Sequence, residues 1–206
     1  MTGGRFRKAV TIAMAAVSIG IALPTAAQTY SDGYKLLKAV EERNREDFDA
    51  LVAKNRTVIN ARDLSSGRTA MHIAVDRRDI VWLVYLANQR ANPNIADNDG
   101  VTPLMRASRI GFFEGVEALV KAGAQVDTPS DTGETPLISA VLRGDTQMMR
   151  ILLGAGANPD RTDNSGRSAR DYARLDGRGS KTMEEIERSA KAAGDDADGE
   201  VYGPSF

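Results

Sequence analysis

The stretch that decides the fold is GVTPLMRASRIG, residues 100–111, because it returns thirty-three residues later as GETPLISAVLRG, residues 133–144. One period upstream stands GRTAMHIAVDRR at 67–78, and one period downstream stands GRSARDYARLDG at 166–177. In every copy glycine comes first, a hydroxyl residue follows two places later and alanine follows seven places later. Four copies in one register indicate an internal repeat with a period of 33 residues.

The repeated residues predict one turn followed by two helices in each unit. The glycine allows the positive φ that a tight turn requires. Thr102 and Thr135 are placed to cap a helix whose first residue is Pro103 or Pro136, a position at which proline loses no hydrogen bond. A second helix with apolar residues at helical spacing follows. In two units it ends in a glycine, such as Gly123, that suits a left-handed helix end.

The period, the order of the elements and the Thr-Pro-Leu signature together resemble the ankyrin repeat family. The resemblance covers about residues 31–193, which is nearly all of the chain after its first segment. It implies an all-α solenoid of stacked helix-turn-helix units joined by β-hairpin-like loops. It also implies a protein-binding scaffold, although a fold alone does not identify a partner.

The repeat register divides the chain into seven segments. They are a signal peptide at 1–27, an N-terminal capping repeat at 30–65, ankyrin repeats at 66–98, 99–131 and 132–164, a C-terminal capping repeat at 165–193 and a disordered acidic tail at 194–206. The last repeat is predicted to be a cap because Arg170 and Asp171 replace the apolar pair of the motif, and terminal repeats need a polar outer face.

The two caps are expected to consist of amphipathic helices. The apolar positions of the N-terminal cap are Leu36, Leu37 and Val40 on one helix and Phe48, Leu51 and Val52 on another, with a break near Asn44. In the C-terminal cap we expect a second helix at Thr182–Ala193, with Met183, Ile186 and Ala190 on one stripe.

Two departures from the repeat carry expectations of their own. Arg90 stands where the next two units have glycine, so the first unit's second helix is expected to end in a distorted turn. Gly115 stands where the neighbouring units have Trp82 and Met148. We expect a large neighbour, Phe113 or Trp82, to fill the space that this glycine leaves.

The first residues have the order of a secretory signal. Arg5, Arg7 and Lys8 precede an apolar run at 9–23, and small residues follow up to Ala27, after which cleavage is expected. The run is short against the roughly 20 residues that span a bilayer, so an uncleaved membrane anchor is the second interpretation. The sequence therefore predicts a periplasmic or secreted protein with no membrane span after cleavage.

The composition narrows the possible functions. Hydrophobic residues make up 42% and charged residues 27% of the chain, as in a soluble folded protein. The sequence contains no cysteine, which excludes disulfides, thiolate catalysis and cysteine zinc ligands. The formal net charge of −1 becomes −4 without residues 1–27, because that segment holds three basic and no acidic side chains. This balance and the 5% aromatic content argue against nucleic acid as a partner.

The chemistry-bearing side chains favour structural roles. His72 is the only histidine, so neither a Ser-His-Asp triad nor a paired-histidine metal site is possible, and its place in the motif predicts support of a helix start. Asp97, Asp99, Asp131 and Asp163 lie beside the turns, which aspartate stabilises by local hydrogen bonds. A calcium site or a catalytic acid pair is the alternative, but the spaced ligands of a calcium loop are missing. We expect no catalytic residue, metal or cofactor.

The candidate binding surface consists of positions that vary between units. The residues predicted to contact a partner are Arg68, Arg77, Val101, Arg106, Arg109, Ile110, Glu134, Leu142 and Arg143. Arg77, Arg109 and Arg143 close the first helices of successive units and are expected to line the concave side. Arginine beside apolar groups is a common composition of contact hot spots. The alternatives are a solvated helix face for the arginines and packing between units for Ile110 and Leu142.

The leading functional hypothesis is a monomeric, non-enzymatic scaffold or adaptor that acts outside the cytoplasm. It binds a protein partner with an acidic surface through the hairpin tips and the concave first-helix face. One alternative is an accessory or regulatory subunit of a periplasmic enzyme, and a weaker one is a hydrolase that uses two acids.

Overall fold

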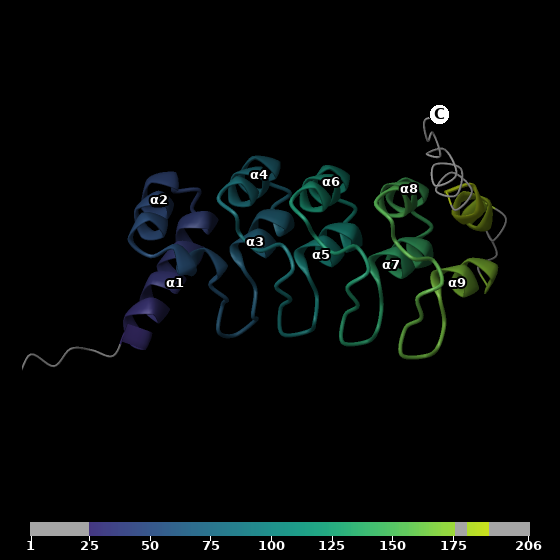
Figure 1. Cartoon of the computed structure of the whole chain (residues 1–206), viewed down its shortest axis with the longest axis horizontal. Helices are drawn as coiled ribbons and strands as arrows, with labels where there is room; N and C mark the ends of the chain where they lie inside the picture. The colour runs from purple at the N-terminus through teal and green to yellow at the C-terminus, as the bar shows by residue number, and fades with distance from the viewer. Residues whose placement is uncertain (1–24, 176–180, 190–206) are drawn as a thin grey trace, which may run out of the picture.

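The computed structural model describes residues 25–175 and 181–189 and shows a row of stacked helix pairs (Figure 1). The labelled elements are α1 (Thr25–Glu41), α2 (Arg45–Lys54), the 3-10 turn η1 (Arg56–Asn60), α3 (Ala70–Asp76), α4 (Ile80–Asn88), α5 (Pro103–Arg109), α6 (Phe113–Lys121), α7 (Pro136–Arg143), α8 (Thr146–Gly154) and α9 (Ala169–Leu175). A further helix spans residues 181–189.

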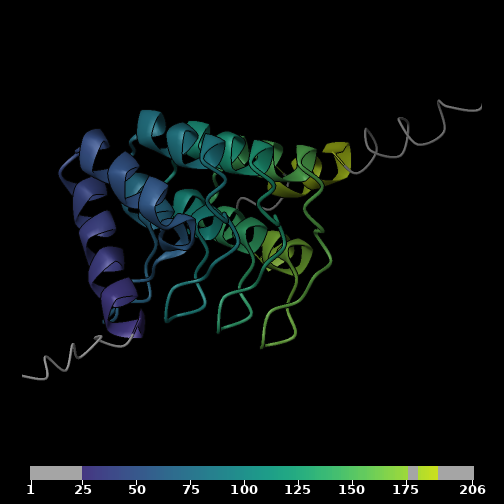
Figure 2. The ribbon, with the colours of Figure 1, turned by 60° about the vertical axis from the view of Figure 1, so that its left-hand side comes forward.

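The helices form two layers, with the loops on one side. The first helices of the units, α3, α5, α7 and α9, form one layer, and each contacts the next in the row. The second helices α4, α6 and α8 form the other layer (Figure 1). Figure 2 shows the loops that precede the first helices projecting side by side. The predicted all-α ankyrin repeat solenoid is therefore confirmed, and in the part of the chain that is described the loops hold an isolated β-bridge, Thr162 to Ser168.

The first helices begin as their sequence predicts. The backbone N–H of Met105 donates to Thr102 Oγ1 over 3.2 Å, and Pro103 is the first helical residue. Thr135 Oγ1 accepts from the Ile138 N–H in the same way, also at 3.2 Å. Each threonine satisfies an N–H that the helix itself leaves without a partner.

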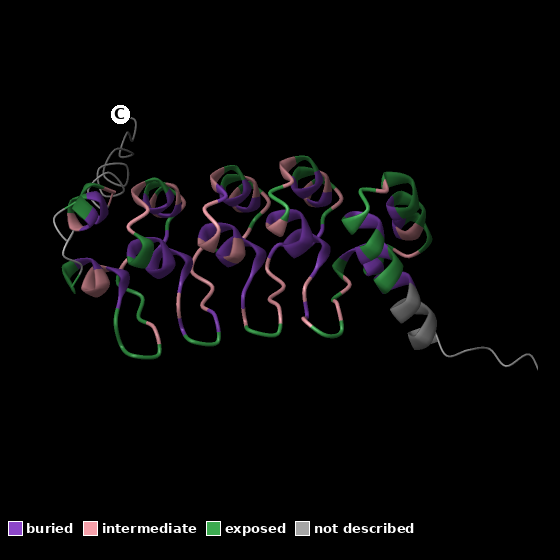
Figure 3. Ribbon diagram, turned by 180° about the vertical axis from the view of Figure 1, so that it is seen from behind, coloured by how far each residue is buried: buried purple, intermediate pink, exposed green. Residues whose placement is uncertain are grey.

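The core is a continuous aliphatic layer between the two rows of helices. Leu104 and Leu137 are fully buried, and so are Ala107 and Ala140, whose small side chains let the first helices approach closely. Figure 3 shows the buried positions on the facing sides of the helix pairs all along the row. No unit buries this surface alone, so the stability of each unit depends on its neighbours.

Arg90 adopts the left-handed conformation that its position requires, with φ +63° against +87° for Gly123. The expected distortion of this helix end is wrong. The Arg90 N–H donates to Ala87 O over 2.9 Å, and the Gly123 N–H donates to Val120 O over the same distance. The reason is that the closing hydrogen bonds require only positive φ, which arginine can adopt at an energetic cost without displacing the turn.

The space beside Gly115 is filled by Phe112, not by Phe113 or Trp82 as expected. A Cβ atom at Gly115 would lie 2.3 Å from Phe112 Cδ1. Phe112 is buried and stands immediately before α6, at the position that aspartate holds before α4 and α8. Its ring can reach this space because residues three apart share one face of a helix.

The caps follow the predicted stripes. Leu36, Val40 and Phe48 are buried, and Asn44 separates α1 from α2 by accepting from the Asp47 N–H over 3.1 Å. At the other end Ile186 is fully buried in the 181–189 helix.

An ion pair attaches the C-terminal cap to α8. Arg150 Nε and Nη2 donate to the two carboxylate oxygens of the buried Glu185 over 2.8 and 2.9 Å. The Arg150 guanidinium lowers the pKa of Glu185.

Three predicted segments fall wholly or partly beyond the described residues. They are the secretory signal through Pro24, the tail at 194–206 and the Ala190 end of the C-terminal stripe. Helix α1 begins at Thr25, so cleavage after Ala27 would remove its first three residues.

Candidate binding surface

The prediction that aspartates stabilise the turns is confirmed for Asp97 and Asp163, whereas the side chains of Asp99 and Asp131 form no hydrogen bond within the described part of the chain. Asp97 Oδ1 accepts from the N–H groups of Asp99 and Val101 over 3.0 and 2.9 Å. Asp163 accepts from backbone N–H groups and from the Tyr172 hydroxyl, and that hydroxyl bond is the main reason why the pKa of Asp163 is lowered. Hydrogen bonds, first of all from the Ser65 hydroxyl, lower the pKa of Asp63 to about 2. The hydrogen bonds that lower the pKa values of Asp63 and Asp163 also hold their turns in shape.

Neighbouring turns are joined by backbone hydrogen bonds. The Asn98 N–H donates to Ser66 O over 2.9 Å, and the Asp131 N–H donates to Asp99 O over 3.3 Å. The approach is close enough that a Cβ atom at Gly100 would lie 2.7 Å from the backbone nitrogen of Asp131. The hairpin tips therefore form one connected row rather than independent loops.

His72 is a structural residue, as its place in the motif predicts. Its Nε2 lies 2.9 Å from Val101 O, a carbonyl that can only accept, so Nε2 carries the hydrogen and Nδ1 accepts. The Thr69 N–H donates to that Nδ1 over 3.1 Å. Burial lowers the pKa of His72, while nearby Asp97 acts in the opposite direction. The imidazole thus caps α3 and ties it to the next hairpin.

A network of charges runs along the first helices. Asp76 receives guanidinium groups from both Arg68 and Arg106, the latter through Nε at 2.6 Å. In the next unit, Arg109 Nη2 lies 2.7 Å from Glu134 Oε2. All five side chains are partly exposed, so each keeps surface available to a partner.

Two of the predicted arginines hold neighbouring first helices together. Arg77 Nη1 donates to the carbonyls of Val40 and Glu41 at the end of α1. Arg143 Nη1 donates to Arg109 O at the end of α5. Because helix C-termini carry partial negative charge, each arginine stabilises the end of a neighbouring helix.

The three arginines predicted to line the concave side, Arg77, Arg109 and Arg143, occupy two different repeat positions. Arg77 and Arg143 share a repeat position with Ile110, whereas Arg109 shares its position with Asp76. Sequence reasoning missed Asp76, although its place thirty-three residues before Arg109 was a signal.

Arg78 was also missed. It donates to Ile110 O and Gly111 O over 2.9 and 2.7 Å. The signal was its alignment with Gly111 and Gly144, which marks it as left-handed, and its φ is +51°.

The apolar members of the predicted site divide into three cases. Val101 was expected to face outward, and this is wrong: it is 5% exposed, and its carbonyl is hydrogen-bonded to the buried His72 of the preceding unit. Ile110 is partly buried and packs against the core. Leu142 is 53% exposed on α7, at the repeat position that Arg109 of the charged network holds on α5.

A shallow hollow lies at the N-terminal end of this side. It has a volume of about 210 Å³ and is lined by Tyr34, Leu37, Lys38, Glu41, Asp63, Ser66, Arg68 and Ile73. Tyr34 is 62% exposed at its edge and was not predicted. We call the surface formed by Tyr34, Arg68, Asp76, Arg106, Arg109, Glu134 and Leu142 the hairpin face.

The comparison with known proteins agrees with this architecture. Two ankyrin repeat family models match the chain, one of three copies over residues 36–130 and one of many copies over residues 119–173. The chain belongs to the ankyrin repeat family.

Two curated relatives share the repeats. The ankyrin repeat protein FPV031 of fowlpox virus (strain NVSL) is 35% identical over 80 residues, which is 39% of this chain and 24% of the viral protein. The poly(ADP-ribose) polymerase tankyrase of Caenorhabditis elegans is 34% identical over 86 residues, 40% of this chain and 4% of the enzyme. The chain thus spans a quarter or less of either relative, and the similarity to tankyrase is a match of repeats only.

Membership indicates what this ankyrin repeat protein can do. Ankyrin repeats are protein–protein interaction modules and are generally not catalytic. Among residues 25–175 and 181–189, no three or more His, Asp or Glu side chains are arranged to hold a metal ion. Over the same ranges, no helix has the length and apolar composition needed to cross a bilayer.

Proposed function

We propose that this ankyrin repeat protein is a non-enzymatic adaptor that acts outside the cytoplasm and binds an acidic surface of a partner protein through its hairpin face. The observation that carries the proposal is the charged network together with an exposed leucine. Three guanidinium groups, on Arg68, Arg106 and Arg109, form ion pairs with the two carboxylates of Asp76 and Glu134, so this group of five side chains carries one net positive charge. An interface of this kind uses the charges for orientation and the apolar side chain for affinity.

The prearranged ion pairs support a binding role. Each arginine is already oriented by a carboxylate, so binding loses less side-chain entropy than it would with free arginines. The guanidinium groups have five N–H donors each and retain donors for a partner carboxylate. Leu142 makes no polar contact that its replacement would break, which makes it the cleanest position for a test.

The test compares capture of a partner by matched variants. Tagged residues 28–206 are offered to an extract from the source organism, beside Leu142→Glu and the swap R109E/E134R. The swap keeps an ion pair between the two positions and reverses the charges that a partner meets. We expect both variants to lose the captured protein, and Gln147→Glu, on the exposed side of α8, to retain it. Capture by all variants alike would refute the hairpin face as the site.

Arg77 and Arg143 are unsuitable for this test. Their guanidinium groups bind carbonyls of the preceding units, so replacement by glutamate would weaken the stacking of the helices as well as any contact with a partner. Loss of capture would then not distinguish binding from folding.

The proposal that the protein is exported rests on its first 27 residues. A basic start, an apolar run and small residues before Gln28 support secretion with cleavage after Ala27. Mass spectrometry of the protein isolated from the periplasm is expected to find Gln28 as the first residue. A full-length chain confined to the cytoplasm would contradict export.

A further inference from the structure

The outer surface of α4 is apolar where the other second helices are polar. Val81 is 73% exposed and Val84 is 43% exposed on the side away from the first helices. The equivalent residues are Glu114 and Glu117 in α6 and Gln147 and Arg150 in α8. Because the three helices occupy the same place in their units, the architecture of the repeat does not require valine here. Exposed apolar groups gathered on one surface commonly mark a contact site.

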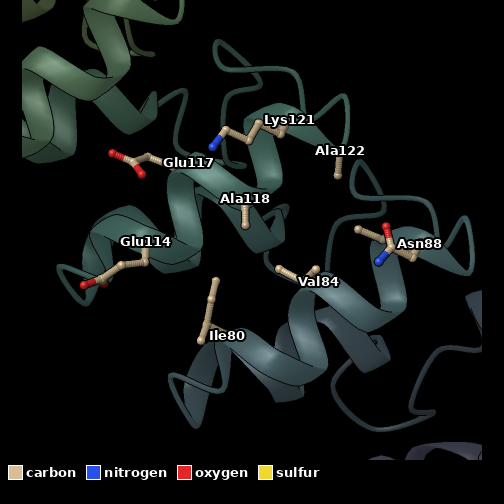
Figure 4. A pocket seen from close by; sticks show the side chains of 9 residues that line it. Ile80, Val84, Asn88, Glu114, Glu117, Ala118, Lys121 and Ala122 are labelled. Atoms are coloured by element: carbon tan, nitrogen blue, oxygen red, sulfur yellow. The ribbon is translucent and has the colours of Figure 1, made fainter.

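Val84 lines a groove between α4 and α6, whereas Val81 lies on the exposed surface of α4 outside its lining. The groove has a volume of about 480 Å³ and is lined by Ile80, Val84, Ala87, Asn88, Glu114, Glu117, Ala118, Lys121 and Ala122. Figure 4 shows Ile80, Val84 and Ala118 facing the space between the two helices, with Glu114 and Glu117 along α6. The α4 wall of the groove is apolar apart from Asn88, whereas the α6 wall combines Ala118 and Ala122 with Glu114, Glu117 and Lys121.

The carboxylates of the groove lack partners within the described part of the chain. Neither Glu114 nor Glu117 forms an ion pair there, although both are exposed. Lys121 is the basic side chain that lines the groove, so the lining carries a net charge of −1. An occupant with a positive charge beside its apolar residues would match both walls.

We propose that this groove binds a basic amphipathic helix of a partner protein. Apolar side chains of that helix, spaced three and four residues apart, enter between Val84 and Ala118. An arginine or lysine on its flank meets Glu114 and Glu117. This is the helix-in-groove mode of recognition, in which an apolar stripe provides affinity and flanking charges provide orientation. The groove lies between second helices, so this partner is additional to the one proposed for the hairpin face.

A second copy of this chain fits the groove less well. The apolar helix that a second copy would place in the groove is its own α4, which carries no charged side chain between Ile80 and Asn88. Laid into the groove, α4 of another copy would cover Glu114 and Glu117 without pairing them. Covering a carboxylate without a partner is costly, whereas a basic helix compensates for the lost water.

The test selects helical peptides against the full chain and maps where they bind. A displayed library of helical peptides is selected on the protein, and the recovered peptides are measured by titration. The groove variant is V81Q/V84R, which places the residues of α8 on α4 and so retains a surface known to fit the repeat. The charge variant is E114Q/E117Q, and the control is Gln147→Glu at the equivalent position of α8. Circular dichroism establishes that each variant is folded.

We expect recovered peptides with an apolar stripe and flanking arginine or lysine. Their Kd should rise about tenfold with V81Q/V84R, by a smaller, salt-sensitive factor with E114Q/E117Q, and not at all with Gln147→Glu or Leu142→Glu. Three results would overturn the proposal. They are recovered peptides whose Kd does not change with V81Q/V84R, recovered peptides that lack basic residues, and a selection that recovers no groove-dependent peptide. Sedimentation of the full chain tests the other occupant: a dimer that dissociates with V81Q/V84R would assign the groove to a second copy instead.

Discussion

The first and second repeats build the same outer helix with opposite choices of side chain. In the first, Asp79 stands before α4 and accepts from the Trp82 N–H over 3.2 Å, while the indole of Trp82 is buried. In the second, Phe112 stands before α6 without capping it, and Gly115 replaces the large residue. Both helices are nine residues long. The first repeat thus combines a capping Asp79 with a large Trp82 one turn later. The second repeat combines a large Phe112 at the cap position with Gly115 one turn later.

The third repeat returns to the arrangement of the first. Asp145 accepts from the Met148 N–H over 3.0 Å, and Met148 is fully buried. The comparison teaches that the repeat conserves a filled space rather than a residue at one position. Four predictions test positions at which the repeats differ, from the largest expected effect to the smallest.

Removing the aromatic ring should produce the largest effect. Phe112→Ala leaves a space that Gly115 cannot fill, so the free energy of unfolding should fall by about 3–5 kcal/mol. The double variant F112D/G115M rebuilds the arrangement of the third repeat and should recover most of that loss. Urea denaturation of both variants and of F112D alone measures the coupling. A double variant no more stable than F112D would show that the two arrangements are not interchangeable.

The turns before the first helices allow a comparison of an inner unit, at Gly100, with the last unit, at Gly166. Gly100→Ala imposes a Cβ atom on a left-handed residue and on the next turn, 2.7 Å from the Asp131 nitrogen, and should cost about 3 kcal/mol. Gly166 also has positive φ, at +77°, but no atom lies within 4 Å of its Cβ position. Gly166→Ala should therefore cost only about 1–2 kcal/mol. Equal losses in chemical denaturation would mean that contact between turns contributes little.

His72 distinguishes the first repeat from the second, which has Met105 at this position. His72→Met leaves Val101 O without its buried donor and should cost about 1–3 kcal/mol at pH 7. Because burial lowers the folded-state pKa, the unfolded chain binds a proton first as the pH falls below about 6.5. The stability that His72 contributes is therefore complete above that pH and is lost on acidification.

The measurement is the free energy of unfolding between pH 7.5 and pH 5 for both proteins. Asp97, Arg68 and Arg106 act on His72 and are present in both, so the difference between the two curves isolates the imidazole. Parallel curves would contradict the assignment of a neutral, buried His72.

Arg90 should give the smallest effect and the opposite sign. Its φ of +63° is strained for a residue that has a Cβ atom, whereas Gly123 and Gly156 adopt positive φ without this strain. Arg90→Gly should stabilise the protein by roughly 0.5–1 kcal/mol. The substitution relieves about 1–2 kcal/mol of backbone strain, which is more than the roughly 0.5–1 kcal/mol of conformational entropy that glycine loses on folding. A thermal midpoint that falls instead would indicate a contact of Arg90 that offsets its strain.

Much of the fold follows from local rules that a single repeat already contains. The 33-residue period, the threonine caps and the prolines at helix starts predict where the first helices begin, because capping involves residues within one turn. The buried leucines and alanines follow from helical periodicity in the same way. The role of His72 was also predictable, since its motif position places it beside the helix start.

The candidate site was predictable only in part. Residue type and repeat position identified the arginines as variable, yet the atoms they meet belong to other units. Arg77 binds the end of α1, Arg143 binds the end of α5 and Arg106 shares Asp76 with Arg68. These partners lie about thirty residues or more away along the chain, or across a helix, and no local pattern indicates them.

The sequence alone therefore establishes the register of the units, the starts of their first helices and the aliphatic core, because each depends on neighbours within one turn or one period. Stacking alone decides that Val101 is buried and that Arg77 and Arg143 reach the carbonyls of the preceding units. The physical reason is that helix propensity and capping act along the chain, whereas burial depends on which surface of the adjacent unit comes to lie against each side chain.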